Sequence, residues 1–176
     1  MVEITWNDYK YHESKLKLLS LSEEKITPFL KDAAIRAAIH AREVGKKRIR
    51  GIYTIDSSSI REAIIIGGGC SGIMATRMGG AILRIKGKRK GLNHYKARQT
   101  QKGVFASLKK GSGKTIHGSF SWNGTFFRRG GDRLPINKLV GLAVPQLFQN
   151  PAILTEMQKE AMQMYEKRVE HELSRL

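Results

Sequence analysis

Residues 20–44, SLSEEKITPFLKDAAIRAAIHAREV, set the architecture of this chain. Ser20 and Glu23 have the spacing of a capping box, in which two side chains bond each other's backbone N–H groups at the start of a helix. Apolar residues then recur every three or four positions, which predicts a long amphipathic helix. They are Ile26, Phe29, Leu30, Ala33, Ala37, Ala41 and Val44.

Two features bound this helix. Pro28 lies too deep for the first turn of a helix with that cap, so the helix either starts nearer Thr27 or is kinked at the proline. At the other end, the basic run Lys46–Arg48 suits a helix C-terminus, because cations oppose the negative end of the helix dipole. Beyond it, Asp56–Ser59 supply an N-cap for a short helix, Ile60–Ile64.

Short segments rich in β-branched or aromatic residues follow, separated by Gly, Lys and Asn, and they predict antiparallel strands. Asn123-Gly124 stands between two aromatic-containing runs and is a strong signal for a hairpin turn. A final amphipathic helix begins at about Ala152, with charged residues opposite its apolar face. The predicted strands are Ala81–Ile85, Val104–Leu108, Thr115–Phe120 and Thr125–Arg128.

These elements predict an α+β fold: a long N-terminal amphipathic helix packed on a small, mostly antiparallel β-sheet, with a C-terminal helix. A chain of 176 residues has the length of one ordinary domain. We expect residues 1–19 to form an N-terminal extension and residues 20–176 to form a single domain.

The composition argues against several classes of protein. Cys70 is the only cysteine, so neither an intramolecular disulfide nor a cysteine-cluster zinc site can form. The N-terminus lacks the basic and apolar regions of a secretory signal. No apolar run approaches the roughly 20 residues that span a bilayer. We therefore expect a soluble, non-exported protein of cytosolic origin, with no membrane partner.

The positive charge is concentrated in one part of the chain. The net charge of +17 is far above the magnitude of about 2–8 that suits a small soluble domain. Residues 63–131 hold 14 Lys and Arg and no Asp or Glu, whereas residues 132–176 hold six basic and six acidic residues. Because a block of one sign attracts polyanions, the partner should be acidic, either nucleic acid or an acidic protein surface.

Two glycine-rich stretches resemble nucleotide-binding motifs without their context. Gly67–Gly72 fits G-x-G-x-x-G, but no Asp or Glu stands between Glu62 and Asp132 to hold a ribose. Gly111–Thr115 resembles the end of a P-loop, but Leu108 stands where its first glycine belongs, and a strand is predicted where a helix should follow. We expect a flexible or tightly turned loop at the first stretch and a hairpin turn at the second.

No catalytic, cofactor or metal site is predicted. The histidines lack metal-ligand spacing and fit surface or core-edge positions better than catalytic ones. Cys70 has no histidine near it in sequence, so nothing supports a nucleophile there. The five histidines are His12, His40, His94, His117 and His171.

The basic stretch supplies the candidate contacts to DNA or to an acidic partner. Such residues contact phosphates independently of sequence and with strong salt dependence. Aromatic residues are sparse among them, chiefly Tyr95 and Phe105, so stacking of single-stranded bases is not indicated. The alternative is that the cations occupy solvated strand edges, where lysine discourages aggregation. The candidates are Arg84, Lys86, Lys88, Arg89, Lys90, Lys96, Arg98, Lys109 and Lys110.

A distinctive segment runs from Phe126 to Gln146. It begins FFRRGGDRLPI and ends in Val144-Pro145-Gln146. The segment resembles the minor tail protein Z family, the tail completion proteins of long-tailed phages, in which an aromatic-basic strand leads to an Arg-Leu-Pro-Ile turn and a Val-Pro-Gln step. The resemblance covers roughly residues 20–176, and Leu142-Ala143 departs from the family pattern.

The same segment can be interpreted from its chemistry. Pro135 restricts Leu134 to extended conformations. Leu134, Ile136 and Leu139 are available to bury against the sheet. The arginines could bridge to a neighbour's carboxylates, or they could be solvated on a structural turn. The candidate subunit-interface or family-motif residues are Phe127, Arg128, Arg129, Arg133, Leu134, Pro135, Ile136, Pro145 and Gln146.

The resemblance implies a structural protein rather than an enzyme. Such a protein would complete the tail at its head-proximal end, as a homo-oligomeric ring beside tail terminator, tail tube and head-tail connector proteins. The tape measure protein and phage DNA are further candidate partners. We expect it in the virion tail or neck, and in the host cytoplasm during assembly. The alternatives are a sequence-nonspecific nucleic-acid-binding protein using residues 77–129 and, more remotely, an enzyme using the Gly67–Gly72 loop.

Overall fold

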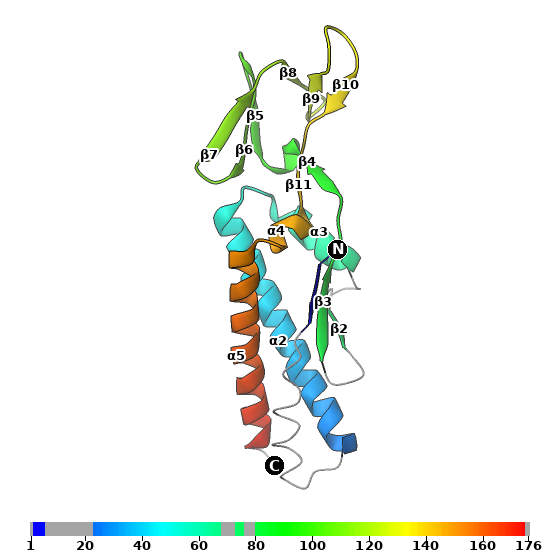
Figure 1. Ribbon diagram of the computed structural model, residues 1–176, viewed down its shortest axis with the longest axis vertical. Coiled ribbons are helices and arrows are strands. Elements are labelled where there is room, and N and C mark those ends of the chain that lie inside the picture. The colour runs from blue at the N-terminus through cyan, green and yellow to red at the C-terminus, as the bar shows by residue number, and fades with distance from the viewer. Residues whose placement is uncertain (1, 6–22, 68–72, 76–79, 175–176) are drawn as a thin grey trace.

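The computed structural model describes residues 2–5, 23–67, 73–75 and 80–174. The molecule is elongated, with two long helices towards one end and small β-sheets at the other (Figure 1). We call the end that contains the long helices the helical half, and residues 89–143 the β half. The predicted α+β class is confirmed.

The long N-terminal helix, α2, spans Glu23–Ile52, and Pro28 lies inside it. Its predicted capping serine lies outside the described residues. The predicted end at Lys46–Arg48 is wrong, because the helix continues to Ile52. Burial explains the continuation: Ile49 and Tyr53 belong to the main hydrophobic core. The apolar contacts of this region stabilise another turn of helix beyond the basic run Lys46–Arg48.

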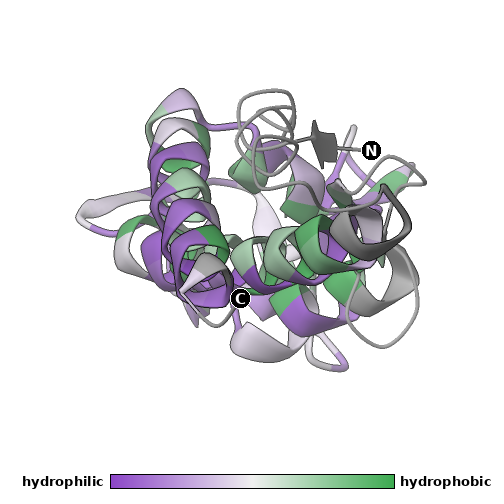
Figure 2. Ribbon diagram, turned by 90° about the horizontal axis from the view of Figure 1, so that it is seen from below, coloured by the Kyte–Doolittle hydropathy of each residue, from purple (hydrophilic) through white to green (hydrophobic). Residues whose placement is uncertain are grey.

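The predicted C-terminal helix is confirmed as α5 (Pro151–Leu173), which packs alongside α2 (Figure 1). Asn150 caps it by accepting a hydrogen bond from the Ala152 N–H at 3.2 Å. Both helices carry hydrophobic and hydrophilic residues (Figure 2), and their buried residues recur every three or four positions, as expected for amphipathic helices with one covered face. In the described part of the chain, none of the helices combines the length and apolar character that crossing a bilayer requires. The buried small residues of α2 are Ala33, Ala34, Ala37, Ala38 and Ala41.

Three strands and a short helix complete the helical half: β1 (Val2–Thr5), β2 (Ile73–Ala75), β3 (Ala81–Ile85) and α3 (Ser57–Gly67). The strands form an antiparallel sheet with order β1–β3–β2, although β1 falls in the predicted N-terminal extension. Buried residues alternate with half-buried ones along β3, as expected for a strand with one covered face. α3 confirms the short helix predicted after Asp56 and extends to Gly67. Residues 68–72, which include Cys70, lie outside the described chain.

The β half consists of short strands and one 3-10 turn, η2 (Leu92–His94). Its strands are β4 (Arg89–Gly91), β5 (Lys96–Thr100), β6 (Gly103–Lys109), β7 (Ser112–Ile116), β8 (Ser119–Trp122), β9 (Thr125–Arg129), β10 (Ile136–Lys138) and β11 (Val140–Ala143). The short helix α4 (Val144–Phe148) follows β11. Two antiparallel sheets, β5–β6–β7 and β10–β9–β8, enclose a small core, while β11 pairs with β4. Leu92, Val104 and Phe126 are the buried residues of that core. The larger core lies among α2, α3, β3, α4 and α5.

Residues with positive φ shape the hairpins of the β half. Asn123 and Gly124 have φ angles of 47° and 69°, which fit a type I′ turn, so the predicted hairpin is confirmed. Gly111, with φ of 76°, turns the chain between β6 and β7, which confirms the hairpin expected instead of a P-loop. The single strand predicted over Thr115–Phe120 is wrong. Gly118, with φ of 68°, lies between β7 and β8 and divides that stretch into two strands.

Candidate functional site

The β half holds almost no acid. It carries 12 Lys and Arg residues but a single acidic one, Asp132. Most carboxylates of the described chain lie on α2 and α5, in the other half of the molecule (Figure 1). With so little negative charge nearby, the β half presents a positive field to solvent.

The predicted contact residues do not form one continuous patch. Arg84 stands apart, because it lies half-buried on β3 in the helical half, opposite Glu3 in the strand register. The other candidate cations lie at three places, either at the boundary between the two halves or on the sheets of the β half. These are the connection from β3 to β4 with Lys86, Lys88, Arg89 and Lys90, the strand β5 with Lys96 and Arg98, and the β6–β7 turn with Lys109 and Lys110.

The connection from β3 to β4 forms a basic groove of about 520 Å³ against α3. The Lys86 N–H donates to the Ala63 carbonyl at 3.0 Å, which fixes the connection to the helix. One carboxylate, Glu62, lines the groove and forms an ion pair with Lys90. Among the described lining residues, the cations therefore exceed the acids by three. The lining residues are Glu62, Ala63, Lys86, Gly87, Lys88, Arg89 and Lys90.

The outer face of the β5–β6–β7 sheet carries an arginine stacked on a phenyl ring. The Arg98 guanidinium carbon lies 5.5 Å from the centre of the Phe105 ring. Gly113 on the neighbouring strand makes room for that ring, because a Cβ there would stand 2.1 Å from it. Stacking occupies one face of a guanidinium and leaves its edge N–H donors available for a phosphate or carboxylate. Lys96 is exposed on the same face of β5.

The β6–β7 turn is fixed to the end of α2. Lys109 forms a backbone bridge with Tyr53, and its ammonium lies 6.0 Å from the centre of the Tyr53 ring. The Lys110 N–H donates to the Ile52 carbonyl at 2.9 Å. Both lysines are exposed, so this turn brings two cations to the boundary between the two halves.

A second outer face, on β10–β9–β8, gathers Phe120 and Trp122 around Phe127, the one ring of the three that the sequence singles out as a candidate. Phe120 and Phe127 are cross-strand partners with ring centres 6.0 Å apart, and Trp122 lies 6.3 Å from Phe127. Arg129 stacks over Phe120 at 5.7 Å. Trp122 is 69% exposed, and these rings belong to none of the described hydrophobic clusters. Only the register of the hairpin reveals this aromatic-arginine face.

The loop between β9 and β10 projects at the far end of the β half (Figure 1). Its predicted burial is wrong: Leu134 is 71% exposed and Ile136 is 46% exposed. Leu139, in contrast, is half-buried against the small core, as predicted. Arg128 and Arg133 are exposed on the same projection. The arginines are therefore accessible to a partner, and two large apolar side chains lie beside them.

Pro145 and Gln146, at the end of the segment that resembles the tail completion family, stabilise the fold of the chain itself. Pro145 is buried in the first turn of α4. The Gln146 side-chain oxygen accepts a hydrogen bond from the Ala143 N–H at 2.9 Å, which caps α4. A subunit-interface role does not fit a buried proline, and both residues instead direct the chain from β11 into the helical half.

Ser59, His94 and Asp56 form a cluster that joins the two halves. The Asp56 carboxylate lies 2.8 Å from His94 Nδ1, and the Ser59 hydroxyl lies 3.0 Å from the same nitrogen. A Ser-His-Asp triad needs the serine and the aspartate on opposite ring nitrogens, so this arrangement is not one. Asp56 also accepts from the Ser59 N–H at 2.7 Å, the N-cap predicted for α3. The cluster therefore anchors η2 to the start of α3.

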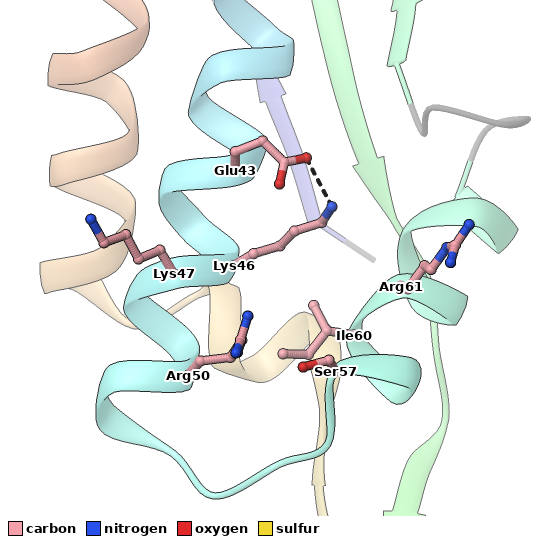
Figure 3. Close-up of a pocket in the computed structure, with 7 residues that line it drawn as sticks. All are labelled: Glu43, Lys46, Lys47, Arg50, Ser57, Ile60 and Arg61. Atoms are coloured by element: carbon pink, nitrogen blue, oxygen red, sulfur yellow. Dashed lines mark hydrogen bonds and ion pairs between the residues drawn. The ribbon is translucent and has the colours of Figure 1, made fainter.

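A second basic pocket, of about 490 Å³, lies between α2 and α3 (Figure 3). Its cations do not converge on a common point. Lys46 turns back to pair with Glu43 at 2.8 Å, and Lys47 and Arg61 point away on opposite sides, which leaves Arg50 near Ser57. Partial burial raises the pKa of Glu43, but the hydrogen bond and charge of Lys46, together with Arg42, outweigh it and lower the pKa. The acid stays ionised and neutralises part of the pocket.

Comparisons with protein-family models, with curated proteins and with solved structures found no match to this chain.

Proposed function

We propose that this protein is a structural component at the head-proximal end of a phage tail, where it completes the tail and contributes to the head-tail junction. The observation that carries the proposal is the separation of an almost acid-free β half from the C-terminal helix α5, which carries five Glu and three Lys or Arg residues. The segment from Phe126 to Gln146 resembles the tail completion family, and this resemblance is our reason for assigning the protein to a phage tail.

A polyanion in the tail channel explains why the charge is so one-sided. In a ring, each copy would turn its β half inward and line a channel with cations around exiting DNA. Lysine and arginine contacts to phosphate are independent of base sequence, as a channel for a whole genome requires. Arg98 suits this role, because stacking on Phe105 orients its guanidinium and leaves its edge N–H donors available.

The helical half would then support the subunit and pack against its neighbours, in addition to contacts between β halves. The proposed partners are tail terminator, tail tube and head-tail connector proteins, with the tape measure protein as a further candidate. The protein would reside in the virion tail or neck, after assembly in the host cytoplasm.

Reversal of the basic groove tests this function. A phage carrying Lys86→Glu, Lys88→Glu, Arg89→Glu and Lys90→Glu should assemble fewer complete tails or lose packaged DNA. Lys159→Glu with Lys167→Glu on α5 is the control, because both lysines are exposed in the helical half. Circular dichroism of each purified variant checks that it folds. Normal numbers of infectious virions from the groove variant would contradict the proposal.

A free, sequence-nonspecific nucleic-acid-binding protein is the second candidate. The exposed cations of the β half favour it, because lysine and arginine contact duplex phosphates independently of sequence, and stacking on a phenyl ring orients the Arg98 guanidinium for such a contact. Salt-dependent binding of duplex DNA by the isolated chain, without any tail protein, would support this candidate. Oligomerisation only in the presence of tail proteins would support the first.

A further inference from the structure

The loop that projects from the β9–β10 hairpin, residues 130–136, forms an arm with apolar side chains in solvent. Leu134 and Ile136 are 71% and 46% exposed. The arm is held in shape by the Gly130 N–H, which donates to the Pro135 carbonyl at 2.7 Å, and by the Arg129 guanidinium, which donates to the Asp132 carbonyl at 3.3 Å. A loop that is already ordered loses little conformational freedom on binding.

An apolar groove of about 390 Å³ opens elsewhere on the β half. It lies between the β6–β7 hairpin and the segment that contains β11, and aliphatic side chains dominate its lining. In the described part of the chain its charged lining residues are Lys109 and Lys114, and both are exposed. Its aliphatic lining includes Leu108, Ile116, Leu139, Val140 and Leu142.

The arm and the groove lie on different surfaces of one copy. The arm occupies the far end of the β half (Figure 1), whereas the β6–β7 turn at one end of the groove is bonded to the end of α2. An apolar projection and an apolar groove on different surfaces of one chain give a head-to-tail contact, which closes into a ring where the rotation allows. Asp132, the single acid of the β half, is exposed on the arm, and the groove presents Lys109 and Lys114.

We propose that the arm of one copy docks in this groove of a second copy, with Leu134 and Ile136 against its aliphatic wall and Asp132 beside its lysines. The proposal deepens the ring assembly of the proposed function, on which it rests, by naming the residues that join neighbouring subunits.

The charges at this contact give it a distinctive salt dependence. Apart from Asp132, both sides are basic, so copies repel one another at low ionic strength. Salt screens that repulsion and strengthens apolar association. Self-association should therefore increase with salt, whereas binding of the protein to DNA should decrease with salt.

Cysteine cross-linking tests the pairing directly. In a Cys70→Ser background, one population carries Leu134→Cys and a differently tagged population carries Ser112→Cys, at the groove. After mixing at high salt and mild oxidation, we expect a disulfide-linked pair that contains one chain of each kind. A population with Lys167→Cys, on the exposed surface of α5, replaces the arm variant as the control. Pairs of arm with arm alone, or no arm-to-groove pair, would overturn the proposal.

Sedimentation of the full chain supplies the second measurement. Leu134→Ser with Ile136→Ser should leave the circular dichroism spectrum unchanged, because both side chains are exposed, and should shift the oligomers at high salt to monomer. Met74→Ser, at an exposed site on β2, is the control. Unchanged sedimentation of the arm variant would refute the arm-groove contact. If the chain is monomeric at every salt concentration but is still incorporated into phage tails, the arm-groove contact is refuted and the proposed function is not.

Discussion

Gly45 of α2 lies directly against Met157 of α5: a Cβ atom at Gly45 would stand 2.5 Å from the Met157 sulfur and 2.7 Å from a ring carbon of Phe148. Both neighbours belong to the main core and are fully buried. A glycine in a helix interior normally weakens the helix by about 1 kcal/mol relative to alanine. The close approach of the two helices explains why glycine stands here.

Gly45→Ala should therefore destabilise the protein although alanine favours helix. We expect a loss of about 1–3 kcal/mol from overpacking, reduced by the gain in helix propensity. Gly51→Ala is a matched control in the same helix, because a Cβ there meets nothing within 4 Å. That change should leave stability equal or raise it by up to about 1 kcal/mol. Urea unfolding of both variants measures the difference, and an equal effect from the two would contradict the packing argument.

Asp56→Ala should loosen the junction between the two halves, since it removes the cap of α3 and a partner of His94. Loss of an N-cap costs about 1 kcal/mol, within a range of about 0.5–2. Partial burial raises the pKa of Asp56, but hydrogen bonds from Ser59, His94 and Ser58 outweigh it and lower the pKa below 3.8. A lowered folded-state pKa gives stability that is present above the ordinary value and is lost as the pH falls through the folded value. The gap in unfolding free energy between wild type and variant should therefore shrink below a pH of about 4. A gap that stays constant with pH would show that the carboxylate charge does not contribute.

Much of the fold was predictable, because local patterns and burial agree in most of its elements. The strand at Ala81–Ile85 and the turn at Asn123-Gly124 carry their own signals, through apolar residues and turn chemistry. β5, β7 and β10 went unpredicted or were misplaced, since KARQT, SGKTI and INK have little apolar alternation. Pairing with neighbouring strands, rather than propensity, makes these segments extended. The end of α2 was missed because the burial of Ile49 depends on distant residues.

The candidate site was only partly predictable, for a related reason. Sequence identified the cations, but their grouping depends on register and topology, which place Arg84 away from the rest. The aromatic-arginine face arises because Phe120 and Phe127 are cross-strand partners, a relation that spacing alone does not state. The exposure of Leu134 was predicted wrongly, because an apolar residue is expected to be buried unless a partner outside the chain covers it.

Tyr95→Phe should remove a hydrogen bond that joins Tyr95, between η2 and β5, to β11. The Tyr95 hydroxyl donates to the Leu142 carbonyl at 2.7 Å, and its loss leaves that acceptor unpaired, at a cost of about 1 kcal/mol or more. Burial raises the pKa of Tyr95 from 10.0 to about 12. A raised folded-state pKa gives stability that is complete below the ordinary pKa and is lost as the pH rises through the folded value. The advantage of wild type over the variant in unfolding free energy should thus decline between pH 10.0 and about 12. An advantage that does not change over this range would contradict the burial of the phenol.

Glu62→Gln should strengthen binding of the chain to duplex DNA if the basic groove contacts phosphate. Among the described residues, Glu62 is the one carboxylate that lines the groove, and it forms an ion pair with Lys90. The amide removes a charge that repels phosphate and frees Lys90 to make a contact of its own. One added phosphate contact steepens the dependence of log K on log salt by about 0.9. Glu170→Gln, at an exposed site on α5, removes the same charge far from the groove and should change the slope little. Equal slopes for the two variants would place the DNA contact elsewhere, on the outer sheet faces of Arg98 and Arg129.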